Sequence, residues 1–209
     1  MGKHVSSPEP VMADSSPADS VASKNEADGA AAQRARQLIS LFHKDVEAFA
    51  GLRGVVAAGV PEPYAGLLAH NSHMTVAMER FHGGSVSLRV VAECTAGVDA
   101  TGGSYAREIL LANGDGRVVQ YGIVRIDLSP LPAASREAIL GKGEPLGRIL
   151  IASGMHRDVQ AVELLQVVPG TAFGQLMEAS QPTYGRVAEI QLDGRPAVEL
   201  LEVVPSFEG

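Results

Sequence analysis

Two arginines and one glutamate have positions suited to binding a negatively charged molecule. In a strand with one buried face every second side chain points inward, so a charged residue that shares its parity with aliphatic residues needs a partner. Arg107 shares its parity with Ile109 and Leu111. Because arginine keeps its charge and presents a planar fork that fits a carboxylate, inward arginines indicate a ligand that carries carboxylates. Arg186 and Glu202 follow the same pattern, sharing parity with Ala188, Ile190 and Leu192, and with Val198, Leu200 and Val204, respectively.

An internal ion pair between an arginine and a glutamate is the structural alternative to a ligand, because buried charges are usually paired with each other. Two other glutamates compete with Glu202 for a position facing a pocket. Glu199 belongs to the same strand, and Glu163 shares its parity with aliphatic residues of an earlier strand. Strand position alone leaves open which of these three carboxylates faces a pocket.

Other polar groups give weaker signals. His70 and His73 are three residues apart, with Glu79 and His82 nearby, but no zinc-protease pattern completes them. The glycine-containing segment 141–147 lacks the spacing and the strand-to-helix context of a phosphate-binding loop. We therefore expect neither a metal nor an organic cofactor.

The elements that must position these residues follow from hydrophobic periodicity. Tight turns that supply positive φ angles are expected at Asn113-Gly-Asp-Gly and at Asp193-Gly194. Because strands occur in consecutive runs, the sequence predicts an α+β fold, an antiparallel sheet of about six strands with helices packed on one face. The expected elements are helices over 31–49, 67–81, 133–140 and 145–152, single strands over 86–92 and 159–168, and hairpins with strands 105–111 and 118–128, and 186–192 and 196–204.

Composition restricts the class of protein. The 209 residues carry 17 Lys and Arg against 24 Asp and Glu, a net charge of −7 that disfavours nucleic acid as a partner. A single cysteine excludes an internal disulfide framework, and no apolar stretch is long enough to suggest a membrane partner, so we expect a cytoplasmic location. Residues 1–30 have the composition of a disordered tail, and residues 31–209 are expected to form one domain. The oligomeric state stays open.

Five segments between about residues 67 and 205 form a recognisable set: His73-Met-Thr, Arg107-Glu-Ile-Leu-Leu, Pro145-Leu-Gly-Arg, Tyr184-Gly-Arg, and Asp193-Gly-Arg-Pro leading to Val204-Pro205. Together, in this order and spacing, they resemble the chorismate lyase family. The resemblance implies an antiparallel sheet with helices on one side, and an enzyme that cleaves chorismate to 4-hydroxybenzoate and pyruvate without cofactor or metal.

The resemblance also assigns roles to residues of this chain. It implies that Arg107 binds a carboxylate of the substrate and that Met74 and Leu146 contact the ligand. The position of the family's acidic residue, counted back from Pro205 without a gap, falls on Leu201 rather than Glu202. A one-residue β-bulge would bring Glu202 to that place.

Two roles remain to be assigned. Glu202, surrounded by aliphatic residues, is expected to act with Arg107 in catalysis, as general acid or base toward the departing pyruvate. Arg186 is expected to hold the second carboxylate, an inference from strand parity rather than from the family.

Two further functions compete with the lyase. One is a non-catalytic domain of the same fold that binds a small molecule, an aromatic carboxylate. Effector-sensing domains of some transcription regulators share this fold, but they normally follow a DNA-binding helix-turn-helix, for which residues 1–60 give no pattern. The other is an enzyme that has drifted to a different enol ether or benzoate-like substrate.

Overall fold

The computed structural model describes residues 29–207, so the predicted tail lies almost entirely outside the described residues. The first helix covers residues 29–39, and a second short helix, α2 (Val46–Phe49), follows. The side chain of Asp45 accepts a hydrogen bond from the backbone N–H of Ala48 and thereby begins α2. The single helix predicted over 31–49 is therefore two helices, separated by a turn.

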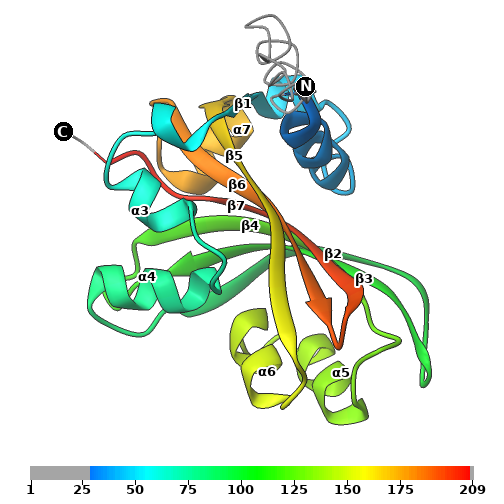
Figure 1. The fold of residues 1–209 in the computed structure, drawn as a ribbon. Helices are drawn as coiled ribbons and strands as arrows, with labels where there is room; N and C mark the ends of the chain where they lie inside the picture. Colours follow the sequence, from blue (N-terminus) through cyan, green and yellow to red (C-terminus); the bar gives the residue numbers. More distant parts are fainter. Residues whose placement is uncertain (1–28, 208–209) are drawn as a thin grey trace, which may run out of the picture.

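Seven strands form one antiparallel sheet in the order β1-β5-β6-β7-β4-β3-β2 (Figure 1). The α+β class and the two predicted hairpins, β3–β4 and β6–β7, are confirmed. The strands are β1 (Ala50–Val55), β2 (Ser87–Asp99), β3 (Gly102–Ala112), β4 (Val118–Asp127), β5 (Arg157–Pro169), β6 (Thr183–Leu192) and β7 (Arg195–Val203). Strand β1 was not predicted, because its sequence Ala-Gly-Leu-Arg-Gly-Val has two glycines and no clear alternation, and it forms by pairing with β5.

Four helices cover one face of the sheet, as predicted. They are α3 (Tyr64–Leu68), α4 (Met74–His82), α5 (Ala133–Leu140) and α6 (Leu146–Ala152), of which α5 and α6 lie below the sheet in Figure 1. Helix 29–39, α2 and α7 (Thr171–Met177) pack against the opposite face. Consecutive residues of the sheet consequently enter different cores: Ile109 packs with α3 and α4, whereas Leu110 packs with the helices of the other face. None of the helices described within residues 29–207 is long and apolar enough to cross a bilayer.

The helix predicted over 67–81 is interrupted at residues 69–73. Helix α3 ends at Leu68 and α4 begins at Met74, which leaves a loop over the sheet. The carbonyl groups at 70 and 72 turn toward the sheet and accept hydrogen bonds from Arg186 on β6. A tertiary contact with a residue distant in the sequence therefore replaces the helical hydrogen bonds that periodicity predicts.

Candidate ligand-binding site

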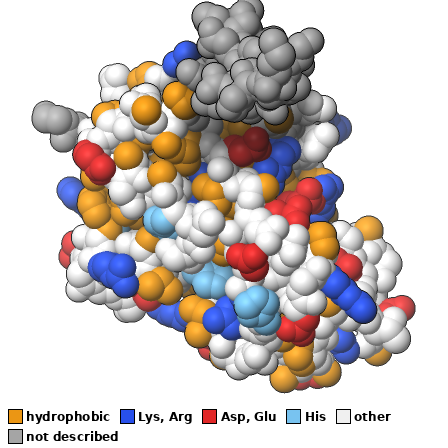
Figure 2. Space-filling model, viewed as in Figure 1, with side chains coloured by type: hydrophobic (Ala, Val, Ile, Leu, Met, Phe, Trp, Pro, Cys, Tyr) orange, Lys and Arg blue, Asp and Glu red, His pale blue; other side chains and the backbone are white. Residues whose placement is uncertain are grey.

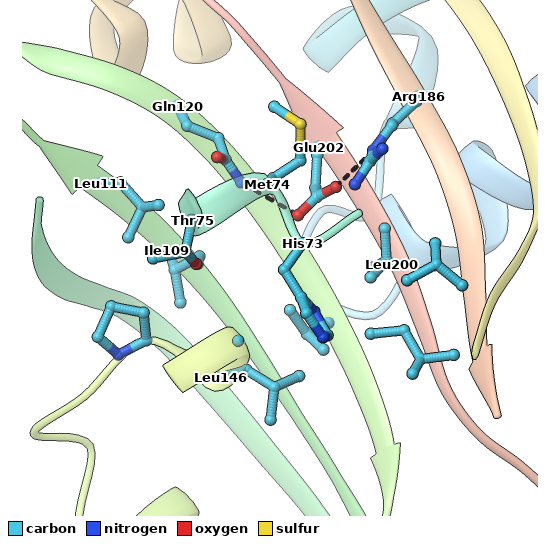
Figure 3. A pocket seen from close by; sticks show the side chains of 15 residues that line it. His73, Met74, Thr75, Ile109, Leu111, Gln120, Leu146, Arg186, Leu200 and Glu202 are labelled. Atoms are coloured by element: carbon cyan, nitrogen blue, oxygen red, sulfur yellow. Dashed lines mark hydrogen bonds and ion pairs between the residues drawn. The ribbon is translucent and has the colours of Figure 1, made fainter. Parts of the chain in front are cut away.

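A small cavity lies between the sheet and the first turns of α4 and α6 (Figure 3). It encloses about 40 Å³, room for only a few water molecules. Most of its wall is aliphatic, and the polar side chains are concentrated at one end. The lining residues are His73, Met74, Thr75, Ile109, Leu111, Gln120, Val124, Pro145, Leu146, Gly147, Val159, Arg186, Ile190, Leu200 and Glu202.

Helices α4 and α6 contact each other beside the cavity. Met74 and Leu146, to which the family resemblance assigns ligand contact, are the first residues of these helices, and both line the cavity. The helices approach closely because Gly147 has no side chain: a Cβ at this position would lie 3.1 Å from Oγ1 of Thr75. In this closed arrangement the helices restrict the cavity to its small volume.

Arg107 is a fully buried cation, with 0% of its surface exposed. It lies beside the cavity: Ile109 on the same strand face and Val124, its cross-strand neighbour, both line the wall. Its Nη2 donates to the carbonyl oxygen of Glu144 at 3.3 Å, whereas Nε and Nη1 have no hydrogen-bond partner. Burial lowers the pKa of the guanidinium, partly opposed by the adjacent Tyr105. No carboxylate within residues 29–207 forms an ion pair with Arg107.

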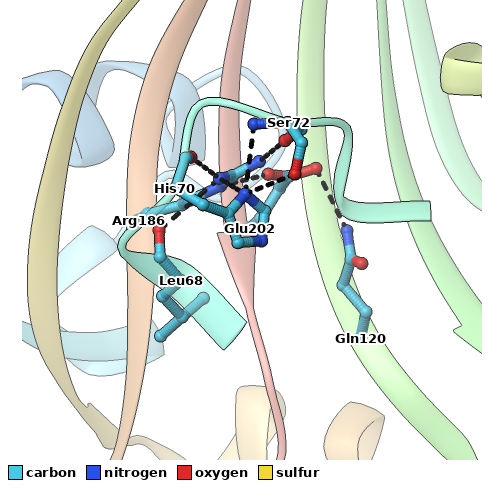
Figure 4. A network of polar contacts seen from close by, with 6 residues as sticks. All are labelled: Leu68, His70, Ser72, Gln120, Arg186 and Glu202. Atoms are coloured by element: carbon cyan, nitrogen blue, oxygen red, sulfur yellow. Dashed lines mark hydrogen bonds and ion pairs between the residues drawn. The ribbon is translucent and has the colours of Figure 1, made fainter. Parts of the chain in front are cut away.

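Arg186, by contrast, is fully engaged by the protein (Figure 4). Its Nε donates to Oε2 of Glu202 at 2.8 Å, and these residues face each other directly across β6 and β7. Its other two nitrogens donate to carbonyl oxygens of Leu68, His70 and Ser72, at 3.5, 2.7 and 3.0 Å. The guanidinium is 1% exposed and ties the α3–α4 loop to the sheet. The internal ion pair, the structural alternative for these inward charges, therefore forms between Arg186 and Glu202.

The structure also separates the three competing glutamates. Glu202 lines the cavity, while Glu163 and Glu199 form ion pairs elsewhere, with Arg34 and Arg125. No β-bulge occurs at Glu202, because its pairing with β4 and β6 is in register; the irregularity in the β6–β7 ladder lies near the hairpin end. Leu201 points to the opposite core. Strand alternation by itself, without the bulge expected from the resemblance, thus directs Glu202 to the cavity.

The histidines do not assemble into a metal site. His73 lines the cavity, the ring of His70 is directed to Ser72, and Glu79 is paired with Arg148. Within residues 29–207, no group of three or more His, Cys, Asp or Glu side chains has an arrangement able to hold a metal ion. Figure 2 shows acidic and basic side chains interspersed on one face of the molecule, with histidines among them.

The histidines around the α3–α4 loop make folding stability sensitive to acid. Burial, Arg157 and Arg186 lower the pKa of His73, and burial followed by Arg186 lowers that of His70. The folded protein therefore binds protons less readily than the unfolded chain, whose histidines titrate near 6.5. We expect the free energy of unfolding to fall as the pH drops from about 7.5 to 5.5.

Thermal melting over this pH range checks the effect in wild type and in His73→Asn. The His73→Asn variant should lose part of the dependence, whereas the matched substitution His156→Asn, at an exposed residue, should retain it. A melting temperature that stays constant, or rises, as the pH falls from about 7.5 to 5.5 would contradict the lowered pKa values of His70 and His73.

No family model matches the sequence, and no curated protein matches it. Among solved structures, the effector domain of PhnF from Mycobacterium smegmatis is similar at 17% identity, covering 65% of this chain and 89% of that one, with a TM-score of 0.43. A GntR-family transcriptional regulator from Bacillus cereus shares 14% identity over 59% and 96%, with a TM-score of 0.40. The C-terminal domain of the histidine utilization repressor from Pseudomonas syringae shares 12% over 59% and 96%, with a TM-score of 0.40.

The prediction that this chain is a chorismate-cleaving enzyme is contradicted. The three solved structures are an effector domain, a GntR-family transcriptional regulator and the C-terminal domain of a repressor, and none of them is described as a lyase. Within the chain, the carboxylate expected to transfer protons, Glu202, accepts a charge-assisted hydrogen bond from Arg186, and the cavity beside it has a volume of only about 40 Å³. The physical reason for the error is that an inward glutamate on the last strand has the same sequence pattern whether it transfers a proton or neutralises an arginine.

Proposed function

We propose that this domain binds a small organic acid, an aromatic carboxylate, without transforming it. One observation carries the proposal: Arg107 is completely buried, two of its guanidinium nitrogens lack partners, and no ion pair within residues 29–207 neutralises it. A buried unpaired charge is costly, and a carboxylate that accepts two hydrogen bonds from the guanidinium fork removes that cost.

The apolar side chains that line the cavity next to Arg107 favour a ligand with an aromatic ring. Ile109, Leu146 and Leu200 are apolar side chains from three separate elements that surround the same space. Pockets for small molecules typically combine such a wall with a few polar groups that fix orientation. A benzene ring placed here would exchange water for aliphatic contacts while its carboxylate lies toward Arg107.

Binding requires the closed cavity to open. A volume of about 40 Å³ is far below the roughly 300 Å³ at which ligand pockets usually begin. The carbonyl of Glu144, in the loop between α5 and α6, occupies one hydrogen-bonding site of Arg107. We infer that this loop and the first turn of α6 move away from α4 and that the ligand carboxylate replaces the carbonyl as the acceptor.

Thermal melting with 4-hydroxybenzoate tests the proposal. At a concentration 100 times its Kd, a ligand that binds only the folded state adds about 2.7 kcal/mol to the free energy of unfolding. For a domain of this size, that corresponds to a rise of about 5 to 10 °C in Tm. The neutral analogue 4-hydroxybenzamide, of similar shape, is the control and should give a much smaller shift. Equal shifts for acid and amide, or none for the acid, would refute acid binding.

A further inference from the structure

Glu93 on β2 lies directly opposite Arg107 on β3 in the antiparallel ladder. The register shifts by one residue just before Glu93, between Val90 and Ala92. Without this bulge, Ala92 would face Arg107; bulges of this kind re-aim side chains and are frequent beside functional sites. Residues opposite each other share one face of the sheet, with Cβ atoms about 4.5–5.5 Å apart. The bulge therefore places a carboxylate on the same face as the buried guanidinium.

Glu93 forms its ion pair with Lys142 rather than with Arg107. Its Oε1 accepts a hydrogen bond from Nζ of Lys142 at 2.5 Å, and its Oε2 accepts one from the hydroxyl of Tyr105 at 3.0 Å. Lys142, followed by Tyr105, lowers the pKa of Glu93, so the carboxylate is ionised at neutral pH. Both of its oxygens are engaged by these two groups, while Nε and Nη1 of Arg107 stay unpaired.

Lys142 belongs to the segment between α5 and α6, which also reaches Arg107. The carbonyl oxygen of Glu144, two residues further on, accepts the hydrogen bond from Nη2 of Arg107 at 3.3 Å. This segment thus contacts both members of the opposed pair, the cation through a carbonyl and the carboxylate through an ammonium. Because the ammonium ends a flexible four-carbon chain, it can remain on Glu93 while the backbone at Glu144 moves aside for a ligand.

A carboxylate attached to the neighbouring strand would compete strongly with an acid in solution. A group linked to a site acts there at an effective concentration on the order of millimolar. If Glu93 turned toward Arg107, it would neutralise the buried charge and occupy the guanidinium fork that a ligand carboxylate needs. The contacts of Glu93 with Lys142 and Tyr105 prevent this and leave the charge of Arg107 without an internal counter-ion.

We infer that Lys142 is a positioning residue that holds Glu93 away from Arg107 and thereby keeps the guanidinium available to an external acid. The inference rests on the proposed function and adds an internal competitor at the same site. Lys142 acts through Glu93 and has no need to touch the ligand. This distinguishes it from a cation that attracts the ligand directly, whose removal would weaken binding whether or not Glu93 is present.

Isothermal titration with 4-hydroxybenzoate tests this role in a double-variant cycle. Lys142→Met should weaken binding about 10-fold, because a competitor that occupies Arg107 for about nine-tenths of the time lowers the apparent affinity by that factor. Glu93→Gln should change the affinity by less than about 3-fold, and its addition to Lys142→Met should restore binding. Lys142→Arg, which keeps the cation, should bind as the wild type does. The matched control Arg34→Met, which removes a cation from an ion pair with Glu163, should also leave the affinity unchanged.

Urea unfolding without ligand gives a second readout, which does not depend on acid binding. Lys142→Met should raise the urea midpoint in the wild-type background, because the released Glu93 pairs with the buried Arg107. In the Arg107→Met background, the same substitution should lower the midpoint slightly, because only a partly exposed ion pair is lost. A purely structural role of Lys142 would lower the midpoint in both backgrounds.

The outcomes separate this inference from the proposed function. Weakening by Lys142→Met that persists when Glu93→Gln is also present would show direct attraction of the ligand and would overturn the inference. An unchanged affinity in Lys142→Met, or a urea midpoint that falls equally in both backgrounds, would overturn it as well. If the wild type binds no acid, the proposed function fails, and the unfolding measurements still decide whether Lys142 holds Glu93 away from Arg107.

Discussion

Replacing Arg107 with methionine is expected to weaken acid binding by about 10- to 150-fold and, at the same time, to make the free domain more stable. A charge-assisted hydrogen bond contributes about 1.5–3 kcal/mol, which sets the loss of affinity. The gain in stability arises because Arg107 is buried without an acidic partner. We expect a gain of about 1–4 kcal/mol, the range seen when buried ion pairs are replaced by apolar residues of similar volume. Titration calorimetry measures the first effect and urea unfolding the second.

The opposite signs of these two effects distinguish a binding residue from a structural one. Arg125 is the matched control, since it is partly exposed and paired with Glu199 on the side of the sheet away from the cavity. Arg125→Met should leave acid binding unchanged and alter stability by less than about 1 kcal/mol. If Arg107→Met lowered stability by several kcal/mol and left binding intact, Arg107 would be a structural residue and the proposed function would lose its basis.

Glu202→Leu is expected to have the largest effect on stability, a loss of about 3–5 kcal/mol. The substitution leaves Arg186, which is 1% exposed, without its counter-charge, and breaking a buried pair by removing one partner costs this much. For a domain of this size the corresponding fall in Tm is about 6 to 20 °C. Urea unfolding and thermal melting of the purified variant measure the change directly.

A neighbouring glutamate provides the control for this experiment. Glu199 lies on the same strand, points to the other side of the sheet and is half exposed in its pair with Arg125, so Glu199→Leu should cost less than about 1 kcal/mol. The double variant Arg186→Met with Glu202→Leu should recover part of the loss, because it removes both charges, although the carbonyl groups of the α3–α4 loop lose their donor. Equal losses in the free energy of unfolding for Glu202→Leu and Glu199→Leu would show that the buried pair contributes no more to stability than the exposed pair.

The two inward arginines differ in how many protein acceptors lie within reach of their guanidinium groups. Arg186 satisfies its nitrogens with one carboxylate and three backbone carbonyls, and in doing so holds the loop that leads into α4. Arg107 has a single backbone acceptor at 3.3 Å. A ligand carboxylate that binds Arg107 therefore supplies hydrogen-bond acceptors that the protein does not provide. A ligand that binds Arg186 would have to displace a complete set of hydrogen bonds.

Local patterns in the sequence were sufficient for most of the fold. Alternation along strands identified Arg107, Arg186 and Glu202 as inward residues, and the structure buries both arginines and points the glutamate into the cavity. Asn-Gly and Asp-Gly turns identified both hairpins. These features depend on residues close together in the chain, because parity and turn conformation are properties of a few consecutive residues.

Only the tertiary structure decided which charge has a partner. Strand parity treats Arg107 and Arg186 alike, and each lies opposite a glutamate on a neighbouring strand. Glu202 pairs with Arg186, whereas Glu93, opposite Arg107, is bonded to Lys142 and Tyr105 instead. The break between α3 and α4 likewise depends on hydrogen bonds from Arg186, 116 residues away from His70. Gln120 had no sequence signal, since an uncharged residue on a strand does not reveal that its amide is buried beside a carboxylate. Neutralisation and hydrogen-bond satisfaction depend on distances between remote segments, and the folded chain alone sets those distances.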